Sequence, residues 1–217
     1  MNVYSFSQEG EDKELYNRFF NYKNGFFIEL GAMDGVMYSN TLFFEKYLNW
    51  TGVLIEPTPD QFQKLTVNRP NCHNFNFAIS LIDGEVEFVG GSALGGMTHT
   101  MIDYHREAWK LEEAFGKPFL VKSKPIKEVV KDLNIEMVDF FSIDVEGGEI
   151  EVLKTWDWNI PVYLVLLEIG YPHIPNAVAK NEECREFLKS QGFVLEGQIS
   201  INEIWVNHKN RRQNPSI

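Results

Sequence analysis

The sequence predicts an α/β fold with a mostly parallel sheet, and three observations support this prediction. Short apolar runs at 26–30, 52–56, 138–146 and 162–169 are long enough for buried strands and far too short for a membrane span. Segments with helical spacing separate these runs, as is typical of βαβ units. Acids lie at the end of nearly every run: Glu29, Glu56, Asp144, Glu146 and Glu168. Because ligands of such sheets bind outside the carboxyl ends of the strands, these acids mark the candidate site.

Composition narrows the class of protein. A chain of 217 residues predicts one domain, which we place at 1–207, followed by a flexible, basic and polar tail at 208–217. The formal net charge of −11 argues against nucleic acid or an anionic membrane as a partner. The N-terminus has no basic and apolar signal segment, and the two cysteines lack metal-type spacing. We therefore expect a cytoplasmic protein with reduced thiols.

The first half of the chain predicts the opening unit of a nucleotide-binding domain. In order, we expect a helix within 5–20, a strand at 26–30, a helix at 40–48, a strand at 52–56, a helix at 60–67 and a strand at 72–80. Pro57 and Pro59 end the second strand. A buried strand that runs through a glycine turn into a helix is typical of a nucleotide site.

The second half alternates again after an irregular region. We expect a strand at 85–89, a mobile glycine-rich loop at 90–100 that covers a site, a helical insertion at 103–117, and a short strand and helix within 122–134. The two apolar runs follow, with a helix at 149–156 between them. A helix at 180–191 and strands near 193–196 and 203–207 complete the domain.

The glycine turn indicates which nucleotide is bound. Gly31 removes a side chain where a ligand can approach the backbone, but Met33 occupies the position where a dinucleotide site needs a second glycine. A dinucleotide is therefore disfavoured. Glu56 can accept hydrogen bonds from both ribose hydroxyls, so an adenosine ligand with positive charge, such as S-adenosyl-L-methionine, fits better.

The acids near the last two apolar runs indicate a site for a metal, a general base or sugar hydroxyls. Asp144 and Glu168 end strands that we expect to be neighbours, about 4.8 Å apart, and Glu146 adds a third carboxyl group. Such groups repel unless they share a proton or a cation. They could hold Mg²⁺, act as a general base, or bind sugar hydroxyls; alternatively they point apart into water.

Two histidines are candidates for a general base, because imidazole titrates near neutral pH. His99 lies in the glycine-rich loop, and His173 follows the Glu168 strand. His73 and His208 are expected to be structural or exposed.

Four stretches together resemble the FkbM-type S-adenosylmethionine-dependent methyltransferase family. They are Ser7–Asp12, Phe27–Gly35 with Ser39–Thr41, Trp50–Pro57, and Asp139–Gly147 with Glu149 and Leu153. The resemblance covers about residues 5 to 206. It implies a class I methyltransferase fold, which has a Rossmann-like, mostly parallel sheet of seven strands, the last antiparallel, with helices on both faces. It also implies methyl transfer to oxygen, often a hydroxyl of a sugar or glycan.

The same resemblance implies roles for individual residues. Cofactor-binding residues would be Gln8, Asp12, Glu29, Gly31, Ala32, Asp34, Gly35, Ser39, Asn40, Glu56, Ala78, Ser80 and Asp144. Among these, Glu29 would face the positive methionine end, and Ser39 and Asn40 would start a helix that favours its carboxylate. Catalytic residues would be Asp144, Glu146, Glu168 and His173, and a divalent metal, Mg²⁺ or Mn²⁺, would bind Asp144 and Glu168.

Two other classes share this scaffold. A nicotinamide-dependent sugar epimerase or dehydrogenase requires a complete glycine motif and usually Tyr-x-x-x-Lys, but Tyr16, Tyr104 and Tyr163 lack the lysine. A non-catalytic nucleotide-binding module would not need intact acids at the strand ends.

Overall fold

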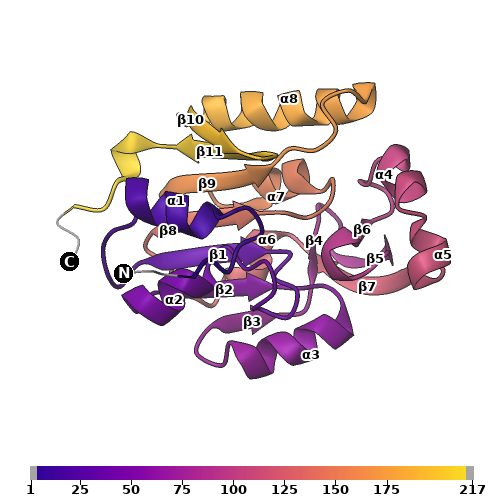
Figure 1. Ribbon diagram of the computed structural model, residues 1–217, viewed down its shortest axis with the longest axis horizontal. Helices are drawn as coiled ribbons and strands as arrows, with labels where there is room; N and C mark the ends of the chain where they lie inside the picture. The colour runs from indigo at the N-terminus through magenta and orange to yellow at the C-terminus, as the bar shows by residue number, and fades with distance from the viewer. Residues whose placement is uncertain (1–3, 214–217) are drawn as a thin grey trace.

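Seven strands form the larger of two sheets in the computed structural model, which describes residues 4–213 (Figure 1). Their order is β3 (His73–Phe75), β2 (Thr51–Ile55), β1 (Phe26–Leu30), β8 (Val138–Ile143), β9 (Val162–Glu168), β11 (Asn202–Val206) and β10 (Val194–Ile199). All neighbours are parallel except those of β11, which runs antiparallel to both β9 and β10. This order and the single reversed strand confirm the predicted class I methyltransferase fold.

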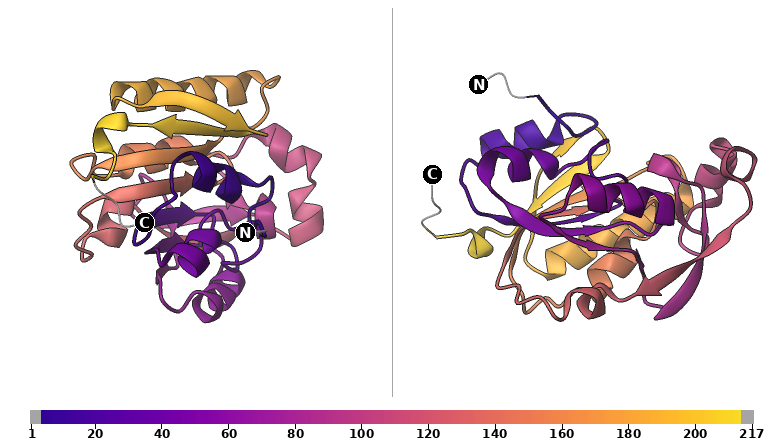
Figure 2. Two further views of the ribbon diagram at one scale, coloured as in Figure 1. Left: turned by 60° about the vertical axis from the view of Figure 1, so that its left-hand side comes forward. Right: turned by 90° about the horizontal axis from the view of Figure 1, so that it is seen from below.

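Helices cover both faces of this sheet (Figure 2). On one face lie α1 (Glu11–Arg18), α2 (Leu42–Leu48) and α3 (Pro59–Asn68); on the other lie α6 (Ile126–Val130), α7 (Glu149–Thr155) and α8 (Pro175–Ser190). Successive strand side chains point to opposite faces, so Phe27 and Phe140 pack beneath the first group, and Ile28 and Phe141 beneath the second. The two apolar layers hold the strands in place, and they therefore also fix the positions of the acids at the strand ends.

The chain between β3 and β8 forms a smaller sheet beyond the carboxyl ends of the parallel strands (Figure 1). We call residues 76–125 the insertion. It contains β4 (Ala78–Ile79), β7 (Phe119–Lys124), β5 (Gly84–Val89) and β6 (Gly96–Met97) in spatial order, with the 3₁₀ helix η1 (Ser92–Leu94) and helices α4 (Asp103–Ala108) and α5 (Leu111–Phe115). The expected helical insertion is thus confirmed, and the glycine-rich segment 90–100 holds η1 and β6.

The single strand predicted at 72–80 is wrong, because the chain turns between β3 and β4. Asn76 Nδ2 donates to the carbonyl oxygens of Glu56 at 2.8 Å and Pro57 at 3.0 Å. These bonds anchor the chain beside the end of β2, so that β3 joins the large sheet and β4 joins the small one.

The C-terminal elements differ in extent from the prediction. Helix α8 begins at Pro175 rather than near residue 180, because proline is well suited to the first turn of a helix. In the predicted tail, 208–210 form a 3₁₀ helix and Arg212 pairs with the buried Asp139 at 2.6 Å, whereas 214–217 lie outside the described residues. In the part of the chain that the structure describes, no helix has the length and apolar character that crossing a membrane requires.

Candidate functional site

A cavity of about 490 Å³ lies at the carboxyl ends of the parallel strands, between the two sheets. Of the residues predicted for the site, it is lined by Gln8, Gly31, Asn40, Glu56, Ala78, Asp144, Glu146, Glu168 and His173. The remaining seven are not in its lining: Asp12, Glu29, Ala32, Asp34, Gly35, Ser39 and Ser80. A volume of this size suits a ligand of nucleoside dimensions.

Gly31 is required by the close approach of two backbones. It has φ +73°, and a Cβ atom built on it would lie 2.1 Å from the Asp144 carbonyl oxygen. Any side chain would therefore push the end of β1 away from the end of β8. Gly31 thus shapes the cavity wall and also permits the packing of two central strands.

Glu56 is held rigidly at the end of β2, where it lines the cavity. Its carboxylate accepts hydrogen bonds from the backbone N–H of Met33 at 3.0 Å and of Thr58 at 2.8 Å, and from the Thr58 hydroxyl at 2.5 Å. Burial raises its pKa, and these donors oppose the rise. A carboxylate has about four lone-pair positions, and these three donors leave about one of them for a ligand hydroxyl.

Glu29 does not face the cavity, which corrects the role expected for it. It accepts hydrogen bonds from Asn40 N at 2.7 Å and Ser39 Oγ at 3.0 Å, and the buried guanidinium of Arg69 lies 3.9 Å away. The polar groups before α2 that were expected to hold a ligand carboxylate are therefore bonded to Glu29. The cation that balances Glu29 belongs to the protein.

The other predicted residues outside the lining have local structural roles. Asp12 accepts from Phe6 N at 2.7 Å and Ser7 Oγ at 3.0 Å, which fastens the segment before α1. Asp34 accepts from the N–H groups of Val36 and Met37 in a turn.

Three further residues outside the lining make contacts within the protein. Ala32 N donates to the Ile55 carbonyl at 3.2 Å, and Ser80 Oγ donates to Glu151 at 2.6 Å. A Cβ atom on Gly35 would lie 2.6 Å from side-chain atoms of the buried Arg69, so Gly35 also allows close packing.

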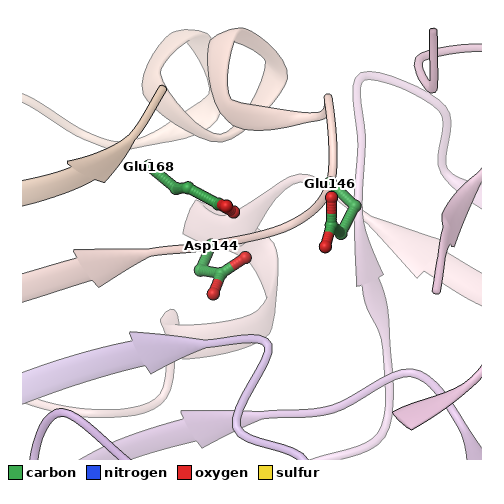
Figure 3. Close-up of side chains that lie close together, drawn as sticks. All are labelled: Asp144, Glu146 and Glu168. Carbon is green, nitrogen blue, oxygen red and sulfur yellow. The ribbon is translucent and has the colours of Figure 1, made fainter. Parts of the chain in front are cut away.

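Asp144, Glu146 and Glu168 converge at one point of the cavity (Figure 3). One carboxylate oxygen from each lies within 4.8 Å of those of the other two, which confirms the predicted proximity of the two strand ends. Burial and the nearby Asp144 raise the pKa of Glu146 to about 9, and the same causes raise the pKa of Glu168 well above its usual range. Three carboxyl oxygens suit a hard divalent cation, and without a cation the cluster retains protons at neutral pH.

His105 is the residue that the sequence reasoning missed. Its buried ring lies in α4, where Nε2 is 3.2 Å from the Leu94 carbonyl oxygen. Because that oxygen can only accept, Nε2 carries the proton and neutral Nδ1 is the acceptor. Nδ1 lies 2.7 Å from the Tyr171 hydroxyl and 3.3 Å from Glu146 Oε2, and burial lowers the His105 pKa. Nothing in the polar segment 103–117 indicated that one histidine would face the acids.

The other histidines are placed as follows. His173 lines the cavity, with its ring edge-on to Tyr104 at 5.8 Å. His99 is exposed, lies outside the lining and is 3.3 Å from Glu151. His73 and His208 are exposed, as expected.

One family model matches most of the chain. The family model described as the methyltransferase FkbM domain matches residues 29–195. A search of curated proteins finds no match.

The solved structures that match the chain share little sequence with it. Fibrillarin from Methanococcus jannaschii, a pre-rRNA processing protein, is 13% identical with a TM-score of 0.47, over 85% of this chain and 67% of that one. Fibrillarin from Aeropyrum pernix, solved with bound S-adenosyl-L-methionine, is 11% identical with a TM-score of 0.43, over 85% and 66%. A putative rRNA methylase from Clostridium thermocellum is 9% identical with a TM-score of 0.49, over 94% and 97%. The chain spans about two thirds of the length of both fibrillarins.

Proposed function

This chain belongs to the FkbM methyltransferase domain family and is a methyltransferase that uses S-adenosylmethionine, and from that premise we propose that it methylates a hydroxyl group of a sugar or glycan. The observation that carries the proposal is the cluster of Asp144, Glu146 and Glu168, which places proton acceptors against the wall formed by Gly31. A hydroxyl is a poor acid, so methylation at oxygen requires such an acceptor.

The proposed cofactor lies along the ends of β1 and β2. Glu56 accepts a ribose hydroxyl, and Ala78 borders the adenine. Asn40 and Gly31 border the methionine end, and Asp144 provides negative charge for its cationic groups. This arrangement differs from the sequence-based one, because Glu29 and Ser39 are hydrogen-bonded to each other and lie outside the cavity lining.

The proposed reaction is an in-line displacement. The acceptor oxygen attacks the methyl carbon, a C–O bond forms as the C–S bond breaks, and S-adenosylhomocysteine leaves. The hydroxyl proton passes to the cluster, in which Glu146 and Glu168 are the candidate acceptors. Their raised pKa values make them stronger bases than ordinary carboxylates, although they must first lose a proton at neutral pH. The protein's main contribution is positioning.

A divalent metal, Mg²⁺ or Mn²⁺, remains part of the proposal. Asp144 and Glu168 would hold it, with Glu146 as a third oxygen ligand, because the oxygens of all three are within reach of one ion. When bound, such an ion lowers the pKa of a hydroxyl group.

The remaining expectations rest on charge and composition. With a net charge of −11, we propose that neither nucleic acid nor a membrane is a partner, and that the protein works in the cytoplasm. Family membership argues against the nicotinamide enzyme. A non-catalytic module stays the alternative.

Transfer of labelled methyl groups from S-adenosylmethionine to a panel of glycosides tests the proposal. We expect Asp144→Asn to abolish transfer, whereas Glu56→Gln mainly weakens cofactor binding measured by calorimetry. Glu107→Gln is the matched control, since Glu107 is exposed and outside the cavity. Binding of S-adenosylmethionine without transfer to any hydroxyl compound would favour the non-catalytic module.

A further inference from the structure

The cavity extends beyond the acid cluster to a region that the proposed cofactor does not account for. The cofactor residues follow β1 and β2, which lie on one side of β8 in the sheet. The lining on the other side comes from the insertion, the loop after β9 and the start of α8, and includes Leu94, His105, Trp109, Tyr171, His173 and Lys180. Because the two groups meet at Asp144 and Glu146, the second region is where an acceptor would reach the methyl group.

Trp109 is the most exposed of the five tryptophans. Its exposed fraction is 52%, whereas Trp50, Trp156 and Trp205 are at most 4% exposed and Trp158 is partly buried. Its indole Nε1 donates to the Tyr171 hydroxyl at 3.2 Å. The polar edge of the ring is therefore fixed, and much of the flat apolar surface stays open where Trp109 borders the cavity.

Tyr171, which accepts the hydrogen bond from Trp109, is itself in contact with other rings. The Tyr171 hydroxyl that receives the indole N–H also lies 2.7 Å from His105 Nδ1. Tyr104, which is 44% exposed, meets Tyr171 edge-on at 5.4 Å and His173 edge-on at 5.8 Å. Trp109 and His173 thus line the same cavity, and Tyr104 packs against His173 from outside its lining; we call these three rings the aromatic rim.

The insertion that carries Trp109 is fixed against the acid cluster. A Cβ atom on Gly147 would lie 2.8 Å from the Thr100 carbonyl oxygen, and one on Gly96 would lie 3.0 Å from the Glu146 carbonyl oxygen. A side chain at Gly147 would force the two backbones apart, and one at Gly96 would fit only if its neighbours shifted. Lys180 Nζ also donates to the Thr100 carbonyl. The aromatic rim and the acids are therefore held in one arrangement before any ligand binds, which lowers the cost of binding.

We propose that the aromatic rim is the acceptor subsite, with Trp109 as the surface on which a sugar ring lies while one of its hydroxyls reaches the acid cluster. The inference rests on the proposed function. A sugar ring has an apolar C–H face that packs on an aromatic ring, and its hydroxyl edge pairs with carboxylates. A nucleobase would also stack on tryptophan, but its phosphates would meet three carboxyl groups and a net charge of −11.

The test compares Trp109→Ala, Trp109→Phe and Phe115→Ala for transfer to methyl glycosides of hexoses, 6-deoxyhexoses and hexuronic acids. Phe115 is the control because it is 45% exposed on the same insertion but outside the cavity lining. We expect Trp109→Ala to raise the KM for an accepted glycoside at least about tenfold, and Trp109→Phe to raise it about two- to threefold, because the ring remains but its N–H is lost. The Kd for S-adenosylmethionine and the KM of Phe115→Ala should stay unchanged.

Tryptophan fluorescence gives a second readout that needs no turnover. Adding the accepted glycoside should shift the emission of the wild type and not that of Trp109→Phe, since Trp109 is the most exposed tryptophan. If the wild type methylates a glycoside and Trp109→Ala keeps its KM, the subsite is refuted and the proposed function stands. If the wild type methylates none of the glycosides, or only RNA or amines, the sugar function fails and the subsite with it.

Discussion

Replacing Glu146 by Gln should stabilise the cofactor-free protein while it removes methyl transfer. Burial and Asp144 raise the pKa of Glu146 from 4.5 to about 9. At pH 7 the folded protein therefore keeps this proton, whereas the unfolded chain releases it. Since the unfolded state binds fewer protons between these two pKa values, stability falls as pH rises through this range. Glutamine resembles the protonated acid and has no proton to lose.

The magnitude follows from the pKa difference. Between pH 4.5 and pH 7 the difference is about 2.5 units at about 1.4 kcal/mol each, so the gain in stability for Glu146→Gln at pH 7 has an upper limit of about 3–4 kcal/mol. At pH 5 the pH lies only about half a unit above the ordinary pKa, so the gain in stability for Glu146→Gln falls below about 1 kcal/mol. For a chain of this size, 3–4 kcal/mol corresponds to a Tm increase of roughly 6–16 °C.

Urea denaturation of metal-free and cofactor-free protein at pH 5 and pH 7 measures both values. The exposed Glu107→Gln variant should change stability by no more than about 0.5 kcal/mol at either pH. If Glu146→Gln gives the same gain at both pH values, or destabilises the protein at pH 7, the raised pKa is not the cause and the reasoning fails.

Three further predictions concern the groups that hold the site in place. Arg69→Met should lower the free energy of unfolding by about 3–5 kcal/mol in urea, because it leaves buried carboxylates without their cation; a change below 1 kcal/mol would contradict this. Arg212→Ala should cost about 1–3 kcal/mol in the same assay, since it removes a charged partner of the buried carboxylate at the start of β8, and near wild-type stability would show that this pairing contributes nothing. Gly31→Ala should lower the yield of folded protein sharply, because its Cβ would overlap the Asp144 carbonyl, whereas Gly170→Ala, with no atom within 4 Å, should fold normally; equal yields would mean that β1 and β8 can separate freely.

The sequence predicted the parts of the site that depend on strand order. Asp144 and Glu168 follow apolar runs, and the pairing of Ile143 with Leu167 places their ends side by side. Parallel strands leave little freedom there, so knowing the order was enough to predict the contact. Glu56 was predicted for the same reason, as the residue directly after a buried strand.

The parts that depend on distant segments were not predictable. Glu29 was assigned to the ligand because no sequence pattern linked it to Arg69, which lies just after α3. His105 was not singled out, because its contact with Glu146 depends on how the insertion folds back over β8. Local periodicity carries no information on either contact, since each is decided by packing between elements that are far apart in the sequence.

The acid cluster is most simply explained as a feature kept for binding. Three carboxyl groups within 4.8 Å of one another cost stability at neutral pH, and Glu146 adds to this with a backbone φ of +53°, which is unfavourable for a residue with a side chain. Neutral amides at the same positions would avoid the stability cost of placing three carboxyl groups close together. A cation placed among the carboxylates would offset it, and both the sulfonium of the cofactor and a divalent metal are such cations. Wild-type stability at pH 7 should therefore rise more with S-adenosylmethionine than stability of Glu146→Gln does, and a ligand that stabilised both proteins equally would show that the cluster does not recognise its charge.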